Sequence, residues 1–358
     1  MAKLTDGLRQ ARENKADEFY TLLNEIEIEL KHYKEYFKNK IILCNCDDPY
    51  ESNFFKYFAI NFNYFGLKKL ISTCYNGSPF AFTQLSLFEE PDEVLSSNNN
   101  SRIAYKVEIT SIEDLNKDGV IDLNDVELLL QQPNVVQKLS GNGDFRSKEC
   151  IELLEAADIV VTNPPFSLFR EFLSLLVLYK KQFIIIGNTN ALAYKEMFSL
   201  FKEDKIRTGY TNFNTGMFFV VPEYYEKYHH LDEYGRKIAR VSTSCWFTNL
   251  PVLRHKEELV LYKKYTPEEY PKYDNYDAIN VSSYNEIPVD YDDVMGVPIT
   301  FLDKFCPEQF ELVGMGTGDT AKEIGVTRNY RGRTDLAITI NGVSTCPYHR
   351  ILIKKRVK

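Results

Sequence analysis

The stretch Asp158–Phe166, with the sequence DIVVTNPPF, decides the fold. The apolar, β-branched run over 157–162 predicts a buried strand, and the apolar spacing over 167–179 predicts an amphipathic helix after it. An Asn-Pro-Pro-Phe turn joins the two. Ligands of open α/β sheets bind at the carboxyl ends of the strands. This turn is therefore predicted to lie where a ligand binds.

The same alternation of strand and helix continues on both sides of this stretch. Strands alternating with helices predict a doubly wound α/β sheet. The predicted strands are 41–45, 68–74, 103–109, 157–162, 183–187, 217–221 and 243–247, and the predicted helices are 6–38, 53–65 and 167–179.

Composition divides the chain into two predicted domains. Residues 76–142 interrupt the α/β pattern as an insertion, with a stretch rich in Gly, Pro and Ser at their start. From residue 265 the chain becomes rich in Tyr, Pro and Asn and loses any helical period. We therefore predict one domain over 1–264, with the insertion inside it, and a smaller mixed or β-rich region over 265–358.

Composition also limits the class of protein. The chain has 358 residues, 44% of them hydrophobic and 26% charged, which is typical of a globular protein. It carries seven cysteines without a CxxC pair, which favours a reducing cytoplasm over a disulfide framework. No apolar run is long enough to predict a membrane span. The net charge of -8 argues mildly against nucleic acid, unless one face is basic.

The residues Asn163, Pro164, Pro165 and Phe166 suit one particular chemistry. The lone pair of an aromatic amine is delocalised, and acceptors that hold both amino hydrogens make the nitrogen nucleophilic. The Asn163 side-chain oxygen and the Pro164 carbonyl are two such acceptors, fixed by the prolines. Phe166 offers a flat face for an extruded base. The structural alternative is a Pro-Pro turn that ends a strand, with Asn163 as a cap.

Six segments carry a resemblance to a known family. They are DEFYT (17–21), CNCDDPYESNFFKYF (44–58), GDFRS (143–147), TNPPFSLFRE (162–171), CWFTNL (245–250) and YTPEEYPKYDNYDAIN (265–280). With these segments the chain resembles the EcoRI adenine methyltransferase family over nearly its whole length, apart from the insertion. The resemblance implies a Rossmann-like catalytic sheet, S-adenosylmethionine as methyl donor, duplex DNA as substrate and a C-terminal target-recognition region.

The resemblance also implies where the methyl donor binds. The DEFYT segment covers its methionine end, and the Gly-Asp-Phe turn holds its adenine. The turn after strand 41–45 has two carboxylates where a glycine-rich loop is usual, and a carboxylate there suits a cationic donor. A helix with core aromatics, an exposed acidic turn and a helix cap are the structural alternatives. The implied cofactor residues are Phe19, Tyr20, Thr21, Asn45, Asp47, Asp48, Asp144, Phe145 and Asn163.

Two further patterns are less specific. Gly314, Gly316 and Gly318 form GMGTG, which we interpret as a loop of the recognition region because no helix is evident after it. The second pattern, DLNKDGVIDLND over 114–125, has oxygen-bearing residues at calcium-loop spacing. Its alternative is an acidic turn held by its own hydrogen bonds. The calcium hypothesis names Asp114, Asn116, Asp118, Asp122 and Asp125 as ligands.

The sequence therefore predicts a cytoplasmic, adenine-specific DNA methyltransferase that flips its target base. Its partners would be double-stranded DNA and a cognate restriction endonuclease acting on the same site. Methylation of another planar amine, an RNA base or a protein glutamine, remains an alternative. So does a non-catalytic DNA-binding or calcium-dependent interaction module, although the intact Asn163–Phe166 turn speaks against it.

Overall fold

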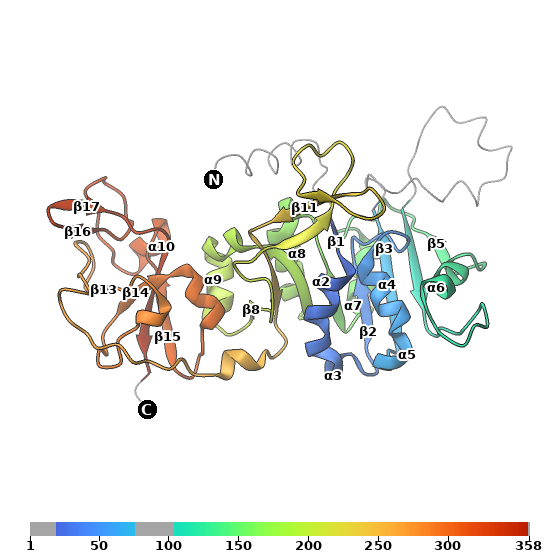
Figure 1. The fold of residues 1–358 in the computed structure, drawn as a ribbon, viewed down its shortest axis with the longest axis horizontal. Helices are drawn as coiled ribbons and strands as arrows, with labels where there is room; N and C mark the ends of the chain where they lie inside the picture. Colours follow the sequence, from blue (N-terminus) through green and yellow to red (C-terminus); the bar gives the residue numbers. More distant parts are fainter. Residues whose placement is uncertain (1–18, 76–103, 357–358) are drawn as a thin grey trace. The chain divides into compact units, whose positions relative to one another are not determined.

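The computed structural model describes residues 19–75 and 104–356 (Figure 1). The chain divides into two compact units. The first unit contains Met1–Asn188 and Gly209–Leu250, and the second contains Thr189–Thr208 and Pro251–Lys358. Among the described residues, no helix is both long and apolar enough to cross a bilayer.

A mixed sheet forms the centre of the first unit. Within this unit the strand order is β5-β4-β3-β2-β6-β7-β12. The four central strands are parallel, and β4, β5 and β12 run antiparallel to their neighbours. Central strands of this kind are buried on both faces and read as continuous apolar runs. The bounds are β2 Ile41–Cys44, β3 Lys69–Cys74, β4 Tyr105–Ile109, β5 Val136–Lys138, β6 Ile159–Thr162, β7 Gln182–Asn188 and β12 Ser244–Thr248.

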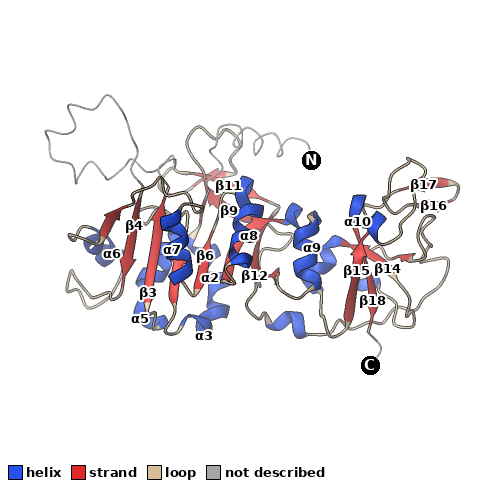
Figure 2. Ribbon diagram, turned by 180° about the vertical axis from the view of Figure 1, so that it is seen from behind, coloured by secondary structure: helices blue, strands red, loops and turns tan. Residues whose placement is uncertain are grey.

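Helices cover both faces of this sheet. Helices α2 and α4 lie on the face seen in Figure 1, and α7 and α8 lie on the face seen in Figure 2. Ser52 and Ser147 cap α4 and α7, since their hydroxyls accept from backbone N–H groups of the first turn. The helical elements are α2 Leu23–Leu30, η1 Lys31–Tyr33, α3 Lys34–Phe37, α4 Asn53–Ile60, α5 Phe62–Phe65, α7 Lys148–Ala156, η3 Phe166–Leu168 and α8 Phe169–Leu178.

A second, antiparallel sheet of the first unit has the order β1-β9-β11-β10. Its strands are β1 Tyr20–Thr21, β9 Met217–Val220, β10 His230–Leu231 and β11 Lys237–Val241. Strand β1 corrects the prediction of a continuous helix over 6–38. Residues 20 and 21 pair with β9 instead, and residues 6–18 lie outside the described chain. Pairing with a strand so distant in sequence cannot be read from local periodicity.

The insertion over 76–142 is described from residue 104 onward. This part adds β4 and β5 to the edge of the large sheet, and its helix α6 (Leu123–Leu130) packs against α4. The predicted strand 103–109 is thereby confirmed as β4. The insertion thus extends the first unit at one sheet edge.

The second unit is built around a sheet of order β13-β14-β18-β15 and a β16-β17 hairpin. Its core includes Phe301, Phe310, Leu352 and Ile353. The strands are β8 Arg207–Thr208, β13 Ile279–Asn280, β14 Met295–Pro298, β15 Phe310–Met315, β16 Ile338–Ile340, β17 Val343–Thr345 and β18 Arg350–Lys355. The helical elements are η4 Thr189–Ala193, α9 Lys195–Lys202, η5 Leu253–Lys256, η6 Tyr284–Glu286, η7 Ile299–Lys304 and α10 Gly318–Glu323.

The two units divide the chain differently from the boundary drawn between residues 264 and 265. Residues 251–264 and 189–208 both belong to the second unit. Helix α9 is held there by long-range contacts, in which Lys202 Nζ donates to Val313 O and Lys195 pairs with Glu323. The change in composition at residue 265 carries no information about such contacts.

Candidate active site

The Asn163–Phe166 turn follows directly from β6, at the carboxyl edge of the parallel strands. Asn163 Nδ2 donates to the backbone oxygen of Phe19 over 2.7 Å, which fixes the side-chain amide. Its Oδ1 is buried, and no donor reaches it from residues 19–75 or 104–356. Buried polar atoms are almost always hydrogen-bonded. This oriented acceptor is therefore available to a donor on a bound molecule.

Phe166 stands in an aromatic cluster. Its ring makes T-shaped contacts with Phe19 and Phe219, at centroid distances of 6.2 Å in each case. Phe19 also contacts Tyr225 at 5.6 Å. Phe166 stays half-buried, whereas Phe19 and Phe219 are buried. The sequence did not single out Phe219, because strand β9 reaches this site through its long-range pairing with β1, nor Tyr225, which follows that strand.

A polar network joins the ends of β2, β3 and β6. The Asp47 carboxylate accepts from the hydroxyls of Ser52, at 3.0 Å, and Thr162, at 2.7 Å. Thr73 Oγ1 donates to Asn45 Oδ1 over 2.8 Å. Asp47 and Asn45 are both buried. These two residues are therefore held by hydrogen bonds beside the Asn163 turn.

Two more buried polar atoms lack a partner in the same region. They are Asn45 Nδ2 and Thr21 Oγ1, again with reference to the described residues. Thr21 is tied to the start of α4, because Asn53 Nδ2 donates to its backbone oxygen over 2.7 Å. An unpaired amide nitrogen and an unpaired hydroxyl suit the carboxylate and amino groups of an amino-acid ligand.

Asp48 lies in a different environment from Asp47. It accepts from Tyr105 Oη at 2.8 Å, from the backbone N–H of Tyr50 at 2.9 Å and from Cys74 Sγ at 3.4 Å. Burial raises the pKa of the Asp48 carboxyl above its usual range. Its oxygens are thus engaged by β3, β4 and the turn itself. The structure gives Asp48 the contacts of a residue that positions this turn.

Tyr50 is a candidate that the sequence did not identify. Its hydroxyl is buried and without a hydrogen-bond partner in the described chain, and its ring lies 6.1 Å from that of Tyr105. Strand β3 ends in Thr73 and Cys74, without a carboxylate. Tyr50, at the end of the turn that follows β2, could have been proposed as a ligand contact from the sequence, since a phenol also hydrogen-bonds to polar ligands.

The Gly-Asp-Phe turn packs against the end of β3. Gly143 has a φ of +77°, and a Cβ at this position would lie 2.4 Å from the backbone oxygen of Cys74. Only glycine allows this approach. The neighbouring Asp144 carboxylate pairs with Arg146 at 2.6 Å. These hydrogen bonds from Arg146 lower the pKa of the Asp144 carboxyl.

Phe145 is buried and contacts Phe172 of α8 edge-on at 5.1 Å. It thus has the environment of a core residue. The structure brings Asp144 and Phe145 to the carboxyl edge of the sheet beside β3. Their contact with the donor's adenine stays a prediction.

Comparisons with known proteins show the family of this chain. The family model "Adenine-specific methyltransferase EcoRI" matches residues 7–356. The chain belongs to this family. It is 45% identical to the Type II methyltransferase M.EcoRI of Escherichia coli, over 98% of this chain and 96% of that protein. It is 37% identical to M.MgeORF184P of Mycoplasma genitalium, over 97% and 98%, and 35% identical to M.MpnI of Mycoplasma pneumoniae, over 97% of each. No solved structure matches the chain significantly.

Membership confirms the resemblance that the six sequence segments carried. This methyltransferase is adenine-specific, and S-adenosylmethionine is its methyl donor. The residues present fit that donor. The unpaired atoms of Thr21 and Asn45 can meet its polar methionine end, and the buried Asp47 carboxylate beside them supplies a negative charge suited to a cation.

The loop over 114–125 has its own hydrogen bonds. Asp114 Oδ2 accepts from the N–H of Gly119 at 2.8 Å, and Asp118 Oδ1 accepts from that of Val120 at 2.9 Å. Asp125 accepts three backbone N–H groups and is buried. No group of three or more acidic, His or Cys side chains arranged to hold a metal occurs among the described residues. Calcium binding by Asp114, Asn116, Asp118, Asp122 and Asp125 stays a prediction.

The interpretation of GMGTG requires a correction. Gly314 and Met315 end strand β15, and Gly318 begins helix α10, so a helix does follow. Gly314 and Gly316 allow close packing, because added Cβ atoms would lie 2.6 Å from Ile324 and 2.3 Å from Leu336. The helix was missed because its six residues are too few to show a periodic pattern.

Proposed function

We propose that this methyltransferase modifies the exocyclic amino group of adenine at specific sites in duplex DNA, after extruding the base from the helix. The observation that carries the proposal is Asn163 Oδ1. It is a buried acceptor, oriented by the bond from Nδ2 to Phe19 and without a donor in the described chain. The name Type II methyltransferase, which the three relatives share, supports DNA as the substrate.

The catalytic step follows from two acceptors. Asn163 Oδ1 accepts one hydrogen of the adenine amino group, and the Pro164 carbonyl accepts the other. Holding both hydrogens draws the nitrogen lone pair out of conjugation and directs it toward the methyl group. S-adenosylmethionine supplies that methyl group as an electrophile. Bond formation between the nitrogen and the methyl carbon would leave the donor as a neutral thioether, and the methylated nitrogen would lose one proton to water.

Phe166 holds the extruded base in this proposal. A flipped base needs an apolar surface to replace the neighbours it stacked on in DNA. The contacts of Phe166 with Phe19 and Phe219 keep its ring in place while leaving part of it exposed. The same Phe19 accepts the hydrogen bond of Asn163. Segment 19–21 therefore connects the base site with the donor site.

The donor site uses residues from three elements. We assign Tyr20, Thr21 and the Asn45 amide N–H to the methionine carboxylate, Asp47 to its amino group and sulfonium side, and Asp144 to the amino group of the donor's adenine. The strand order around β3-β2-β6-β7, with ligand residues after β2 and β6, supports a Rossmann-like methyltransferase sheet.

The second unit is the proposed target-recognition region, which includes residues 265–358. We also propose a cytoplasmic location, which is supported by seven cysteines that form no disulfide in the described chain. A restriction endonuclease that cleaves the same unmodified site is the proposed biological partner, as the names of the relatives suggest.

The test is methyl transfer by the purified full chain. The chain is incubated with methyl-labelled S-adenosylmethionine and either duplex DNA, RNA or a glutamine-containing protein extract. We expect N6-methyladenine in DNA alone, and sequencing that detects methylation should place it at one recurring site. Label in RNA or protein instead would favour the other planar amines. No transfer together with no donor binding by calorimetry would favour a non-catalytic module.

A further inference from the structure

The loop Thr327–Thr334 of the second unit, here called the arginine loop, follows helix α10. Its sequence TRNYRGRT contains Arg328, Arg331 and Arg333 and no acidic residue. All three arginines are exposed. In a chain with a net charge of -8, three cations within six residues are a local reversal of sign.

Hydrogen bonds within the arginine loop fix its shape. Asn329 Oδ1 accepts from the backbone N–H groups of Arg331, at 2.8 Å, and Arg333, at 3.2 Å. The Asn329 N–H donates to Arg333 O over 2.8 Å. Gly332 has a φ of +70°, which suits glycine. The loop therefore presents its arginines from a preorganised backbone.

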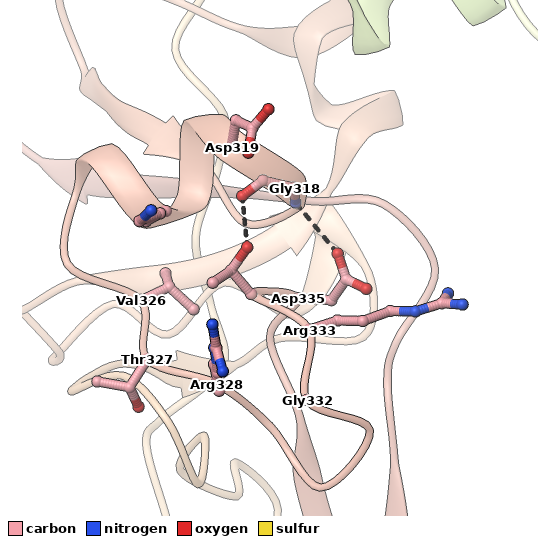
Figure 3. Close-up of a pocket in the computed structure, with 10 residues that line it drawn as sticks. Gly318, Asp319, Val326, Thr327, Arg328, Gly332, Arg333 and Asp335 are labelled. Atoms are coloured by element: carbon pink, nitrogen blue, oxygen red, sulfur yellow. Dashed lines mark hydrogen bonds between the residues drawn. The ribbon is translucent and has the colours of Figure 1, made fainter.

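The arginine loop is also anchored to α10 and to the body of the unit. Thr334 Oγ1 donates to Gly318 O over 2.7 Å, and the Gly318 N–H donates to Asp335 Oδ1 over 3.1 Å (Figure 3). Asn275 Nδ2 donates to Thr327 O over 2.8 Å. Loop and helix line an open pocket of about 670 Å³. Arg328 and Arg333 line it together with Lys322.

The charges of the arginine loop are uncompensated. Within residues 19–75 and 104–356, no carboxylate lies at ion-pair distance from Arg328, Arg331 or Arg333. Other arginines are neutralised, for example Arg146 by Asp144 and Arg236 by Asp232. Among the described residues, Arg331 is the one loop arginine whose guanidinium contacts an aromatic ring. It lies 5.0 Å from the centroid of the Tyr330 ring.

Two acidic residues also line the pocket. Asp335 has one oxygen bound to the Gly318 N–H, and Asp319 is exposed on the first turn of α10. Counting Lys322, the pocket lining holds three cations, Lys322, Arg328 and Arg333, against these two carboxylates. Arg331 adds a further positive charge outside the lining. The surface is therefore net positive, with its guanidiniums free to bind an anion.

We propose that the arginine loop binds the phosphodiester backbone of duplex DNA. This inference rests on the proposed DNA substrate and assigns the contact to named residues. Guanidinium groups match phosphate oxygens in geometry and charge, and each neutralised phosphate releases counterions from DNA. A chain with a net charge of -8 repels DNA at long range, so a basic loop supplies the local positive potential that DNA binding needs.

The test compares two triple variants of the full chain. Arg328→Gln, Arg331→Gln and Arg333→Gln together remove the loop charge. The matched control is Lys38→Gln, Lys68→Gln and Lys180→Gln, which removes the same charge from exposed residues before β2, β3 and β7. Those lysines lie at the amino ends of parallel strands, opposite the Asn163 turn. Binding of a fluorescent mixed-sequence duplex is measured over a salt series, with donor binding by calorimetry.

We expect the arginine variant to bind this duplex more weakly at low salt and to show a smaller salt slope. The slope of log K against log salt should fall in magnitude by about 0.9 for each phosphate that the variant no longer neutralises. Donor affinity and melting temperature should match the wild type. A slope equal to that of the lysine control would overturn the proposal, and so would relaxed sequence choice at an unchanged slope. If the wild-type chain itself fails to bind duplex DNA, the proposed function fails instead.

Discussion

The Asn163–Phe166 turn and the arginine loop differ in how they hold their polar side chains. The turn holds a buried acceptor in one orientation, with a neighbouring hydrogen bond that prevents its rotation. The arginine loop fixes only its backbone and leaves three charged side chains exposed. Chemistry on one nitrogen atom requires an exact geometry, whereas attraction to a polyanion requires charge. Substitutions should therefore affect rate in the first region and affinity in the second.

The largest effect is expected for Asn163→Ala. The substitution removes the preorganised acceptor for an amino hydrogen and should lower the rate of methyl transfer by about 10²–10³. Donor binding, measured by calorimetry, should stay close to that of the wild type. Single-turnover kinetics at saturating DNA separates this loss of rate from any loss of DNA affinity.

Ser174→Ala is the matched control for that experiment. Ser174 is exposed on α8, and its hydroxyl donates only to the nearby Arg170 O. It should retain wild-type turnover and melting. Near-normal turnover in Asn163→Ala would remove the catalytic assignment, because the buried acceptor would then have no role in the reaction.

Phe166 should contribute less, because it binds the base without touching the reacting atoms. Phe166→Ala should weaken productive base binding by about 1–3 kcal/mol, since stacking of one base on an aromatic ring has this magnitude. Phe166→Tyr and Phe166→Trp should be milder. The fluorescence of 2-aminopurine at the target position reports the extruded base. Equal behaviour of the three variants would contradict a stacking role.

Substitution of Asp47 tests the polar network at the ends of β2, β3 and β6. Asp47→Ala would leave the buried Ser52 hydroxyl without its acceptor and leave the Thr162 hydroxyl only the backbone oxygen of Asn45, and it should lower the free energy of unfolding by about 1–3 kcal/mol. Asp277→Ala is the control, because that carboxylate is exposed and forms a surface ion pair with Lys272. Surface pairs contribute little. Denaturant unfolding of the two variants should differ clearly, and equal midpoints would show that the network is not needed for stability.

Sequence predicted the parts of the molecule that depend on neighbouring residues. The apolar run before Asn163 made β6 evident, and the turn after it was correctly placed at a strand end. Contacts between distant segments were not predictable. The bond from Asn163 to Phe19, the pairing of β1 with β9 and the inclusion of α9 in the second unit are of this kind.

The arginine loop shows a second limit. No motif marks Thr327–Thr334, because a run of arginines has no meaning until their partners are known. Only the folded chain reveals that Arg328, Arg331 and Arg333 have no carboxylate beside them in the part of the chain that the structure describes, while Arg146 is paired. Similarly, Asp47 and Asp48 have the same predicted role in the sequence, but their contacts differ. Asp47 accepts from Thr162 in the polar network, whereas Asp48 accepts from Tyr105.

The smallest expected effect concerns calcium at the loop 114–125. A ligand that binds only the folded state stabilises it by about 0.4 kcal/mol when its concentration equals Kd, so calcium should raise the melting temperature slightly. Asp118→Ala should erase this response. The quantity to compare is the change in melting temperature that calcium causes in each variant. The melting temperature alone is not enough, because Asp118 also accepts from the Val120 N–H and its loss weakens the metal-free loop. Asp277→Ala should keep the response. Methyl transfer needs no metal and should survive chelation. If millimolar calcium changes neither the melting of the wild type nor its donor affinity, the loop is an acidic turn held by its own hydrogen bonds.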